Sequence, residues 1–97
     1  MSEVRIKEWD PGQWAVSGDI AESLGVADNE AAFDLVSESM KESNPELRSR
    51  MDFQGDHDLF WVFFASPTAE DDAKELAEIV TEMCDGKPAR RNRRFVR

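Results

Sequence analysis

The sequence predicts an α+β fold, a two-layer sandwich in which an antiparallel sheet of four or five strands carries two helices on one face. The main observation is the segment Leu59–Ala65, seven apolar and aromatic residues whose length and composition favour a strand over a helix. Two longer segments, 28–43 and 66–84, place apolar residues at helical spacing. Turn signals at 10–12 and 55–58 separate short strand-like segments into hairpins.

The first 26 residues predict a hairpin followed by an irregular connection. Apolar residues with a period of two mark two strands, which the turn signal Asp10-Pro11-Gly12 separates. A short helical turn is expected at 20–24. The apolar residues that define these strands are Val4, Ile6 and Trp9 in the first and Trp14 and Val16 in the second.

The first long helix is expected to begin at Asp28 or Asn29, because either side chain can accept a hydrogen bond from a free N–H of the first turn. It should run to about Ser43, where Asn44-Pro45 stops it, because a residue before proline is pushed out of helical geometry. Its buried stripe is predicted to contain Phe33, Val36 and Met40.

The second half of the chain predicts a short strand at 50–54, the apolar strand 59–65 and a second helix. Ser66 is expected to cap that helix, with Pro67 at its first position and Gly86 just beyond its end. A last edge strand is expected at 94–96. The core stripe of the second helix is predicted to comprise Ala73, Leu76, Ala77, Val80, Met83 and Cys84.

The predicted order is therefore ββαββα(β), and without its first strand it is the ferredoxin-like order βαββαβ. Both helices would cover one face of the sheet, leaving the other face open. Successive side chains of a strand alternate between faces, so Phe60, Val62 and Phe64 share one face and Trp61 and Phe63 the other. We expect the first three to form the open, partner-binding face, although the reverse assignment also fits the residues.

The composition predicts one domain at 1–88 with an Arg-rich tail at 89–97. The chain has no apolar run long enough to span a membrane and no signal-peptide core at its start, so a cytoplasmic location is expected.

The net charge is −9, but residues 1–88 hold seven basic and 21 acidic side chains, a charge of −14. Such a body repels nucleic acid and attracts basic partners. The tail could bind nucleic acid, form an edge strand or, as we favour, pair with the acidic body.

Acidic residues recur at helical spacing along both predicted helices. They favour a solvated face that keeps the protein soluble, and the alternative is a docking face for a basic partner. We assign them, with the open sheet face, as candidate partner-binding residues. The two stripes are Glu30, Asp34, Glu38 and Glu42 on the first helix and Asp71, Glu75, Glu78 and Glu82 on the second.

The sequence shows no catalytic constellation, so we expect a non-enzyme without a cofactor or a metal. His57 lies between two aspartates, but neighbouring residues in a strand point in alternate directions, which favours a surface turn over a metal site. Cys84 is the single cysteine, which excludes an internal disulfide, and its place on the predicted core stripe favours a buried thiol. The sequence contains no Gly-rich phosphate-binding loop.

The stretch from Asn44 to Gly86 resembles the immunity protein 51 family of bacterial polymorphic-toxin systems. The matching features are Pro45-Glu46-Leu47 at the helix exit, Met51-Asp52-Phe53, the aromatic strand after an acidic turn, and the Ser-led acidic helix. The Gly-rich segment with a Trp that precedes the first helix in that family is absent, and Asp28–Phe33 stands in its place.

The resemblance implies a small cytoplasmic antidote that binds and neutralises a cognate toxin, often a nuclease with a basic cleft. The acidic stripes would complement such a cleft. A second copy of the chain is a further candidate partner. The alternative function is an acidic inhibitor of a cellular ribonuclease, comparable in size and charge to the RraB family. A nucleic-acid binder acting through the tail is a third.

Overall fold

The structure, a computed structural model, describes residues 4–85 and forms four strands and four helices in that range. The predicted edge strand at 94–96 and the Arg-rich tail lie outside the described residues. The elements are β1 (Val4–Asp10), β2 (Gln13–Gly18), α1 (Ala21–Leu24), α2 (Asn29–Ser43), α3 (Pro45–Arg50), β3 (Asp52–Phe53), β4 (Phe60–Ala65) and α4 (Ala69–Cys84).

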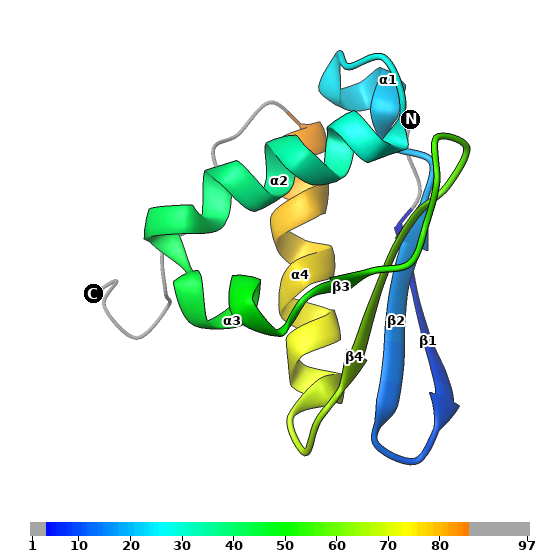
Figure 1. The fold of residues 1–97 in the computed structure, drawn as a ribbon, viewed down its shortest axis with the longest axis vertical. Coiled ribbons are helices and arrows are strands. Elements are labelled where there is room, and N and C mark those ends of the chain that lie inside the picture. The colour runs from blue at the N-terminus through cyan, green and yellow to red at the C-terminus, as the bar shows by residue number, and fades with distance from the viewer. Residues whose placement is uncertain (1–3, 86–97) are drawn as a thin grey trace.

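The four strands form one antiparallel sheet in the order β1-β2-β4-β3. The α+β class and the antiparallel sheet of four strands are therefore confirmed. Figure 1 shows α4 running along the direction of β2 and β4, whereas α2 crosses that direction. The two long helices thus do not lie side by side, so their acidic stripes are not parallel.

The boundaries of α2 agree with the sequence prediction. Asp28 is the N-cap, and its Oδ1 accepts a hydrogen bond of 2.9 Å from the N–H of Ala31. The helix ends at Ser43, before Asn44. Pro45, predicted only to stop this helix, also occupies the first turn of a further helix, α3, which the sequence analysis missed. Proline suits that position because its missing N–H would have no partner there.

The start of α4 differs from the prediction by two residues. The helix begins at Ala69 after Thr68, so the prediction that Ser66 caps it with Pro67 at its first position is wrong. Ser66 instead organises the turn before the helix, where its carbonyl oxygen accepts a hydrogen bond from the N–H of Ala69. Three acidic residues still occupy the first turn of α4, where the helix dipole favours negative charge.

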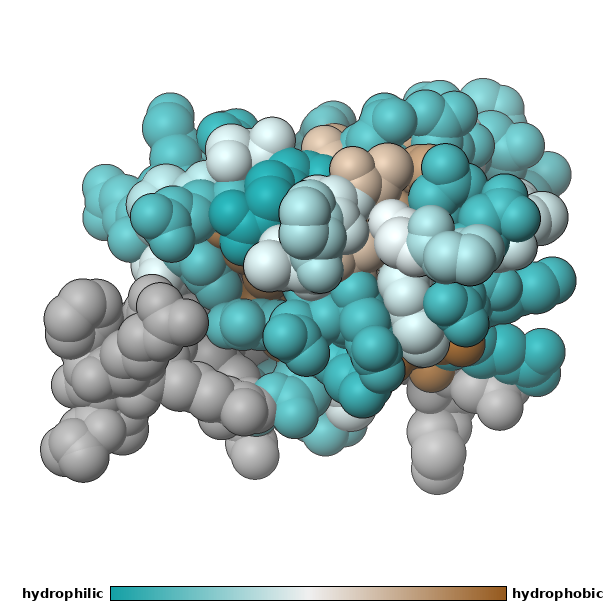
Figure 2. All heavy atoms as spheres, turned by 90° about the horizontal axis from the view of Figure 1, so that it is seen from below, coloured by the Kyte–Doolittle hydropathy of each residue, from teal (hydrophilic) through white to brown (hydrophobic). Residues whose placement is uncertain are grey.

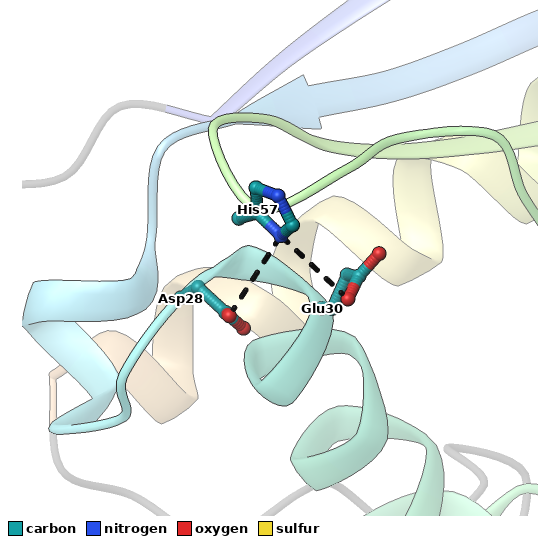
Figure 3. Close-up of side chains that lie close together, drawn as sticks. All are labelled: Asp28, Glu30 and His57. Atoms are coloured by element: carbon teal, nitrogen blue, oxygen red, sulfur yellow. Dashed lines mark ion pairs between the residues drawn. The ribbon is translucent and has the colours of Figure 1, made fainter.

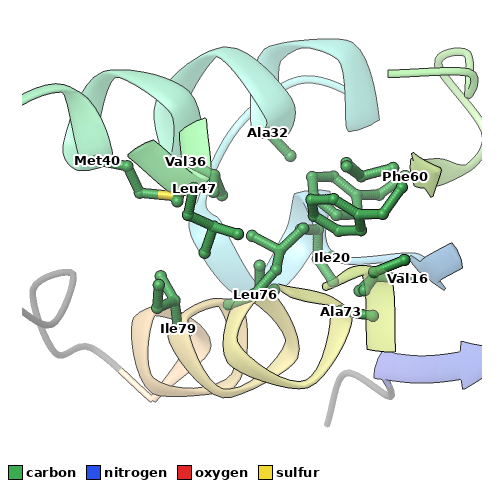
Figure 4. Packing of buried hydrophobic residues seen from close by; sticks show 14 residues of the cluster. Val16, Ile20, Ala32, Val36, Met40, Leu47, Phe60, Ala73, Leu76 and Ile79 are labelled. Carbon is green, nitrogen blue, oxygen red and sulfur yellow. The ribbon is translucent and has the colours of Figure 1, made fainter. Parts of the chain in front are cut away.

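The core lies between the sheet, α2 and α4, and β4 supplies its largest side chains (Figure 4). Phe60 and Val62 are 0% exposed and Phe64 is 1% exposed. The prediction that these three residues form an open, partner-binding face is therefore wrong. The sheet register places Val62 beside Val16 of β2 and Phe53 of β3, so their shared face is the one that the helices cover.

The opposite face of the sheet, called here the outer face, carries Trp61, Phe63 and Ala15. None of them belongs to the core cluster that packs against the helices. Ala15 is nonetheless only 3% exposed, and Trp61 and Phe63 are half-buried. The aromatic surface predicted for one side of this strand is therefore present, but it consists of the other set of residues.

Gly55 lies where the chain turns between β3 and β4, and a side chain there would collide with the backbone. A Cβ at this position would overlap the carbonyl oxygen of Leu59 and lie 2.9 Å from the backbone nitrogen of Trp61. We expect Gly55→Ala to lower the free energy of unfolding by about 1–3 kcal/mol, measured by urea denaturation. The exposed neighbour Gln54 is the control: Gln54→Ala should change it by less than about 0.5 kcal/mol. Equal effects would contradict this role of Gly55.

No helix among residues 4–85 combines the length and the apolar character that crossing a membrane requires.

Candidate functional site

The outward face of α2 presents the first acidic stripe to solvent. The helix buries Ala32, Val36 and Met40, which recur every four residues. The acidic residues are two positions out of phase with these, about 200° around the helix axis, and therefore point away from the core. All four members of this stripe, called here the α2 ridge, are exposed: Glu30, Asp34, Glu38 and Glu42.

Leu35 lies beside the α2 ridge and is 38% exposed. It is three residues from Glu38 and seven from Glu42, spacings that place all three side chains on one side of the helix. Leu35 is not among the candidate residues predicted from the sequence. The available signal was that Leu35 falls outside the stripe of Phe33, Val36 and Met40 and therefore has no position in the core.

The second acidic stripe, on α4, partly serves the fold. Glu75 is half-buried, and its Oε2 accepts a hydrogen bond of 3.1 Å from Nδ2 of Asn44, a buried residue at the end of α2. Glu82 is also half-buried, whereas Asp71 and Glu78 are exposed. The α4 stripe is therefore a less open surface than the α2 ridge.

One acidic residue of α4 is buried in an ion pair that the sequence analysis did not identify. Asp72 is 5% exposed and accepts two hydrogen bonds from Arg50, at 2.8 Å from Nε and 3.1 Å from Nη2. The hydroxyl of Thr68 donates a third, at 3.1 Å. The hydrogen bond with Asp72 raises the pKa of the Arg50 guanidinium, so Arg50 stays charged at neutral pH. The pair joins α3 to the first turn of α4.

The outer face carries a pair of stacked tryptophans. The rings of Trp9 and Trp61 lie 5.5 Å apart at an interplanar angle of 17°, and Nζ of Lys7 is 4.7 Å from the Trp9 ring. The register shifts between Glu8 and Asp10, and such a bulge redirects the side chain of the extra residue, here Trp9. Trp9 is 46% exposed, while Nε1 of Trp61 is buried without a hydrogen-bond acceptor.

The α2 ridge and the tryptophan pair lie on different sides of the sheet. The ridge projects from the helical layer, and the tryptophans project from the face opposite the core cluster. The sequence predicts that acidic and aromatic residues serve one interface together. The predicted aromatic residues Phe60, Val62 and Phe64 are buried, and the tryptophan pair lies on a separate surface from the α2 ridge.

The turn between β3 and β4 brings His57 to the start of α2 (Figure 3). Nδ1 of His57 is 3.8 Å from Oε1 of Glu30 and 4.0 Å from Oδ2 of Asp28. One ligand atom of each residue lies within 4.8 Å of those of the other two. In the sequence, the neighbours of His57 are Asp56 and Asp58. The group of Asp28, Glu30 and His57, called here the His57 cluster, could not be recognised there, because its members lie in distant segments.

Asn29 fixes the position of this turn. It is 2% exposed, and its Oδ1 accepts a hydrogen bond of 2.9 Å from the N–H of Ile20. The carbonyl oxygen of His57 accepts two hydrogen bonds from Asn29, at 3.0 Å from the backbone nitrogen and 3.2 Å from Nδ2. Nδ2 also donates to Oδ1 of Asp19 at 3.1 Å. This amide therefore links the segment before α1, the start of α2 and the turn that bears His57.

The end of the molecule that holds the β1–β2 and β4–α4 turns is mainly hydrophilic. Its hydrophobic residues form small areas between polar ones (Figure 2). The large hydrophobic residues that are exposed among 4–85 are Ile6, Trp9 and Leu35. Cys84 packs against the core, as its place on the helix stripe predicts, but its side chain is half-buried where a buried thiol was expected.

Comparison with known proteins yields no match: no family model, no curated protein and no solved structure matches this chain. The resemblance of residues 44–86 to the immunity protein 51 family therefore stays a prediction from the residues themselves.

Proposed function

We propose that this protein is a cytoplasmic immunity protein of the immunity protein 51 type, which binds a cognate basic toxin and neutralises it without catalysis. The observation that carries the proposal is the outward face of α2, where the exposed acidic side chains of Asp34, Glu38 and Glu42 flank the exposed Leu35. An apolar centre inside a polar rim is typical of a protein–protein interface.

The charge of the α2 ridge supports a basic partner. Carboxylates four residues apart repel one another and cost a helix roughly 0.2–0.5 kcal/mol per pair. Solubility does not require this repulsion, because basic residues placed among the acidic ones would also keep the helix surface soluble. The uninterrupted acidic ridge on α2 therefore favours a further role. A positively charged cleft would relieve the repulsion on binding, and the field of the acidic body would speed association. Nucleic acid is repelled by the same field, except through the Arg-rich tail.

The finer fold is part of the proposal. We infer a ferredoxin-like core composed of β2, α2, β3, β4 and α4. The support is that β4 pairs with both β2 and β3, as the middle strand does in a split β-α-β unit. The hairpin strand β1 occupies the other side of β2. The crossed arrangement of α2 and α4 is a departure from side-by-side packing of the two helices (Figure 1).

Co-expression with a toxin encoded beside its gene tests the proposal. We expect the wild-type chain to restore growth and to form a stable complex. The double variant Asp34→Lys/Glu38→Lys should weaken the complex by roughly tenfold to a hundredfold, because it places like charges against the basic cleft. Circular dichroism and a thermal melt would show that the variant remains folded.

The matched control is Glu22→Lys/Glu46→Lys, which changes the net charge by the same amount at exposed positions outside α2. It should leave affinity close to that of the wild type. Absence of both rescue and complex would refute the immunity function. If both double variants weakened the complex with the toxin equally, binding would depend on the net charge of the chain and not on the α2 ridge. The alternative function would be supported if no toxin gene lay beside the gene for this chain and the chain inhibited a cellular ribonuclease.

A further inference from the structure

We propose that Asp28, Glu30 and His57 form a binding site for a divalent transition-metal ion of the zinc class, independently of the proposed toxin binding. The three donor atoms are Oδ2 of Asp28, Oε1 of Glu30 and Nδ1 of His57, which converge from the start of α2 and from the β3–β4 turn. Their approach is visible in Figure 3, where both carboxylates face the same edge of the imidazole ring.

The spacing of the donor atoms suits a shared ion better than direct hydrogen bonds. A charge-assisted N–H···O bond is about 2.7–2.9 Å long, whereas Nδ1 of His57 lies 3.8 and 4.0 Å from the two carboxylate oxygens. Ligand atoms bound tetrahedrally to Zn²⁺ are about 3.4 Å apart, given metal–ligand distances near 2.1 Å. Side-chain movements of about half an ångström would bring Nδ1 of His57 to that separation from each carboxylate oxygen, and the two oxygens, which lie within 4.8 Å of each other, would approach by at most about 1.4 Å.

The backbone already holds the three residues in place. Asp28 uses Oδ1 to cap α2, which leaves Oδ2 directed toward His57. The carbonyl group of His57 is held by the two hydrogen bonds from Asn29, between Asp28 and Glu30 in the chain. Only side-chain rotations therefore remain to be ordered when an ion binds, which keeps the entropic cost of binding low.

The donor set selects the class of ion. One imidazole nitrogen and two carboxylates suit zinc and similar transition metals, whereas Mg²⁺ and Ca²⁺ prefer oxygen ligands throughout. Two carboxylates neutralise the ion, and the surrounding acidic body attracts it. The positive end of the α2 dipole opposes binding by about 0.3–1 kcal/mol. The side chain of His57 is 68% exposed, so water can complete the coordination shell.

His57 is the single histidine of the chain, so its ring signals in NMR report on the site without ambiguity. We would titrate the full chain with Zn²⁺ alone, in a Cys84→Ser background that removes the competing thiol. Saturable binding should shift the Nδ1 resonance and hold the proton on Nε2. Mg²⁺ at the same concentrations should leave the ring signals unchanged.

Three variants in this background test the carboxylates. Asp28→Asn keeps an oxygen that can cap α2 but removes the charged ligand, and Glu30→Gln changes the second ligand. We expect each to weaken Zn²⁺ binding by roughly tenfold or more. Glu38→Gln, two turns along the same helix, removes one charge of the same ridge and should leave affinity unchanged.

The backbone amide spectrum without metal would show that each variant is folded. The proposal is overturned if Zn²⁺ leaves the His57 ring signals unchanged. It is also overturned if Glu38→Gln weakens binding as much as the two ligand variants do. Neither outcome would bear on toxin neutralisation.

Discussion

Replacing Phe60 with alanine is expected to lower the free energy of unfolding by about 3–5 kcal/mol. The side chain is 0% exposed, and its ring centroid lies 6.3 Å from those of both Phe33 and Phe53. The truncation would leave a cavity at the point where α2, β3 and β4 meet, in addition to the lost burial of the ring. Urea denaturation followed by circular dichroism would measure the change.

Phe63→Ala is the matched control, because it removes the same side chain from the same strand on the other face. Phe63 is half-buried and lies outside the core cluster, so we expect a loss of about 1–2 kcal/mol. Equal losses for the two variants would mean that both faces of β4 are covered to the same extent, in contradiction to the arrangement described above.

Arg50→Met should lower the free energy of unfolding by about 1–3 kcal/mol, because it leaves the carboxylate of Asp72 buried with only the Thr68 hydroxyl as a partner. The pKa of Arg50 is raised in the folded state, so the contribution of the pair is complete below the unfolded pKa of arginine and persists through neutral pH. Urea denaturation at neutral pH is therefore a suitable measurement.

The control for this variant is Lys74→Met, which breaks the exposed pair of Lys74 and Glu70 on α4. That pair should contribute less than about 1 kcal/mol, because both groups are solvated and screened. If Arg50→Met were no more destabilising than Lys74→Met, the buried pair of Arg50 and Asp72 would contribute no more to stability than an exposed pair.

Local sequence signals predicted the elements whose causes are local. The cap at Asp28, the end of α2 before Asn44 and the turn at 10–12 each depend on residues within a few positions of one another. By contrast, α3 was missed because Pro45 both stops one helix and begins the next. The start of α4 was misplaced because Ser66 and Pro67 form a turn in place of the expected cap and first helical position.

Features that depend on distant contacts could not be predicted in the same way. Both faces of β4 are apolar, so alternation separates Phe60 from Trp61 without showing which one meets the helices. Asp72 resembled its acidic neighbours because its partner, Arg50, lies 22 residues away. The approach of His57 to Asp28 likewise requires a fold that brings two distant segments together. The ridge on α2 was predicted correctly as an exposed face, because helical periodicity alone places it opposite Val36.

The central claim is that the outward face of α2 is the surface that binds a basic toxin. Hydrogen–deuterium exchange of the chain, alone and in complex with its cognate toxin, tests it most directly. We predict slower exchange of the α2 amides around Leu35 and Glu38 in the complex, with little change in β1 around Trp9. Slower exchange in β1 and β2 with α2 unchanged would contradict the claim and would assign binding to the outer face.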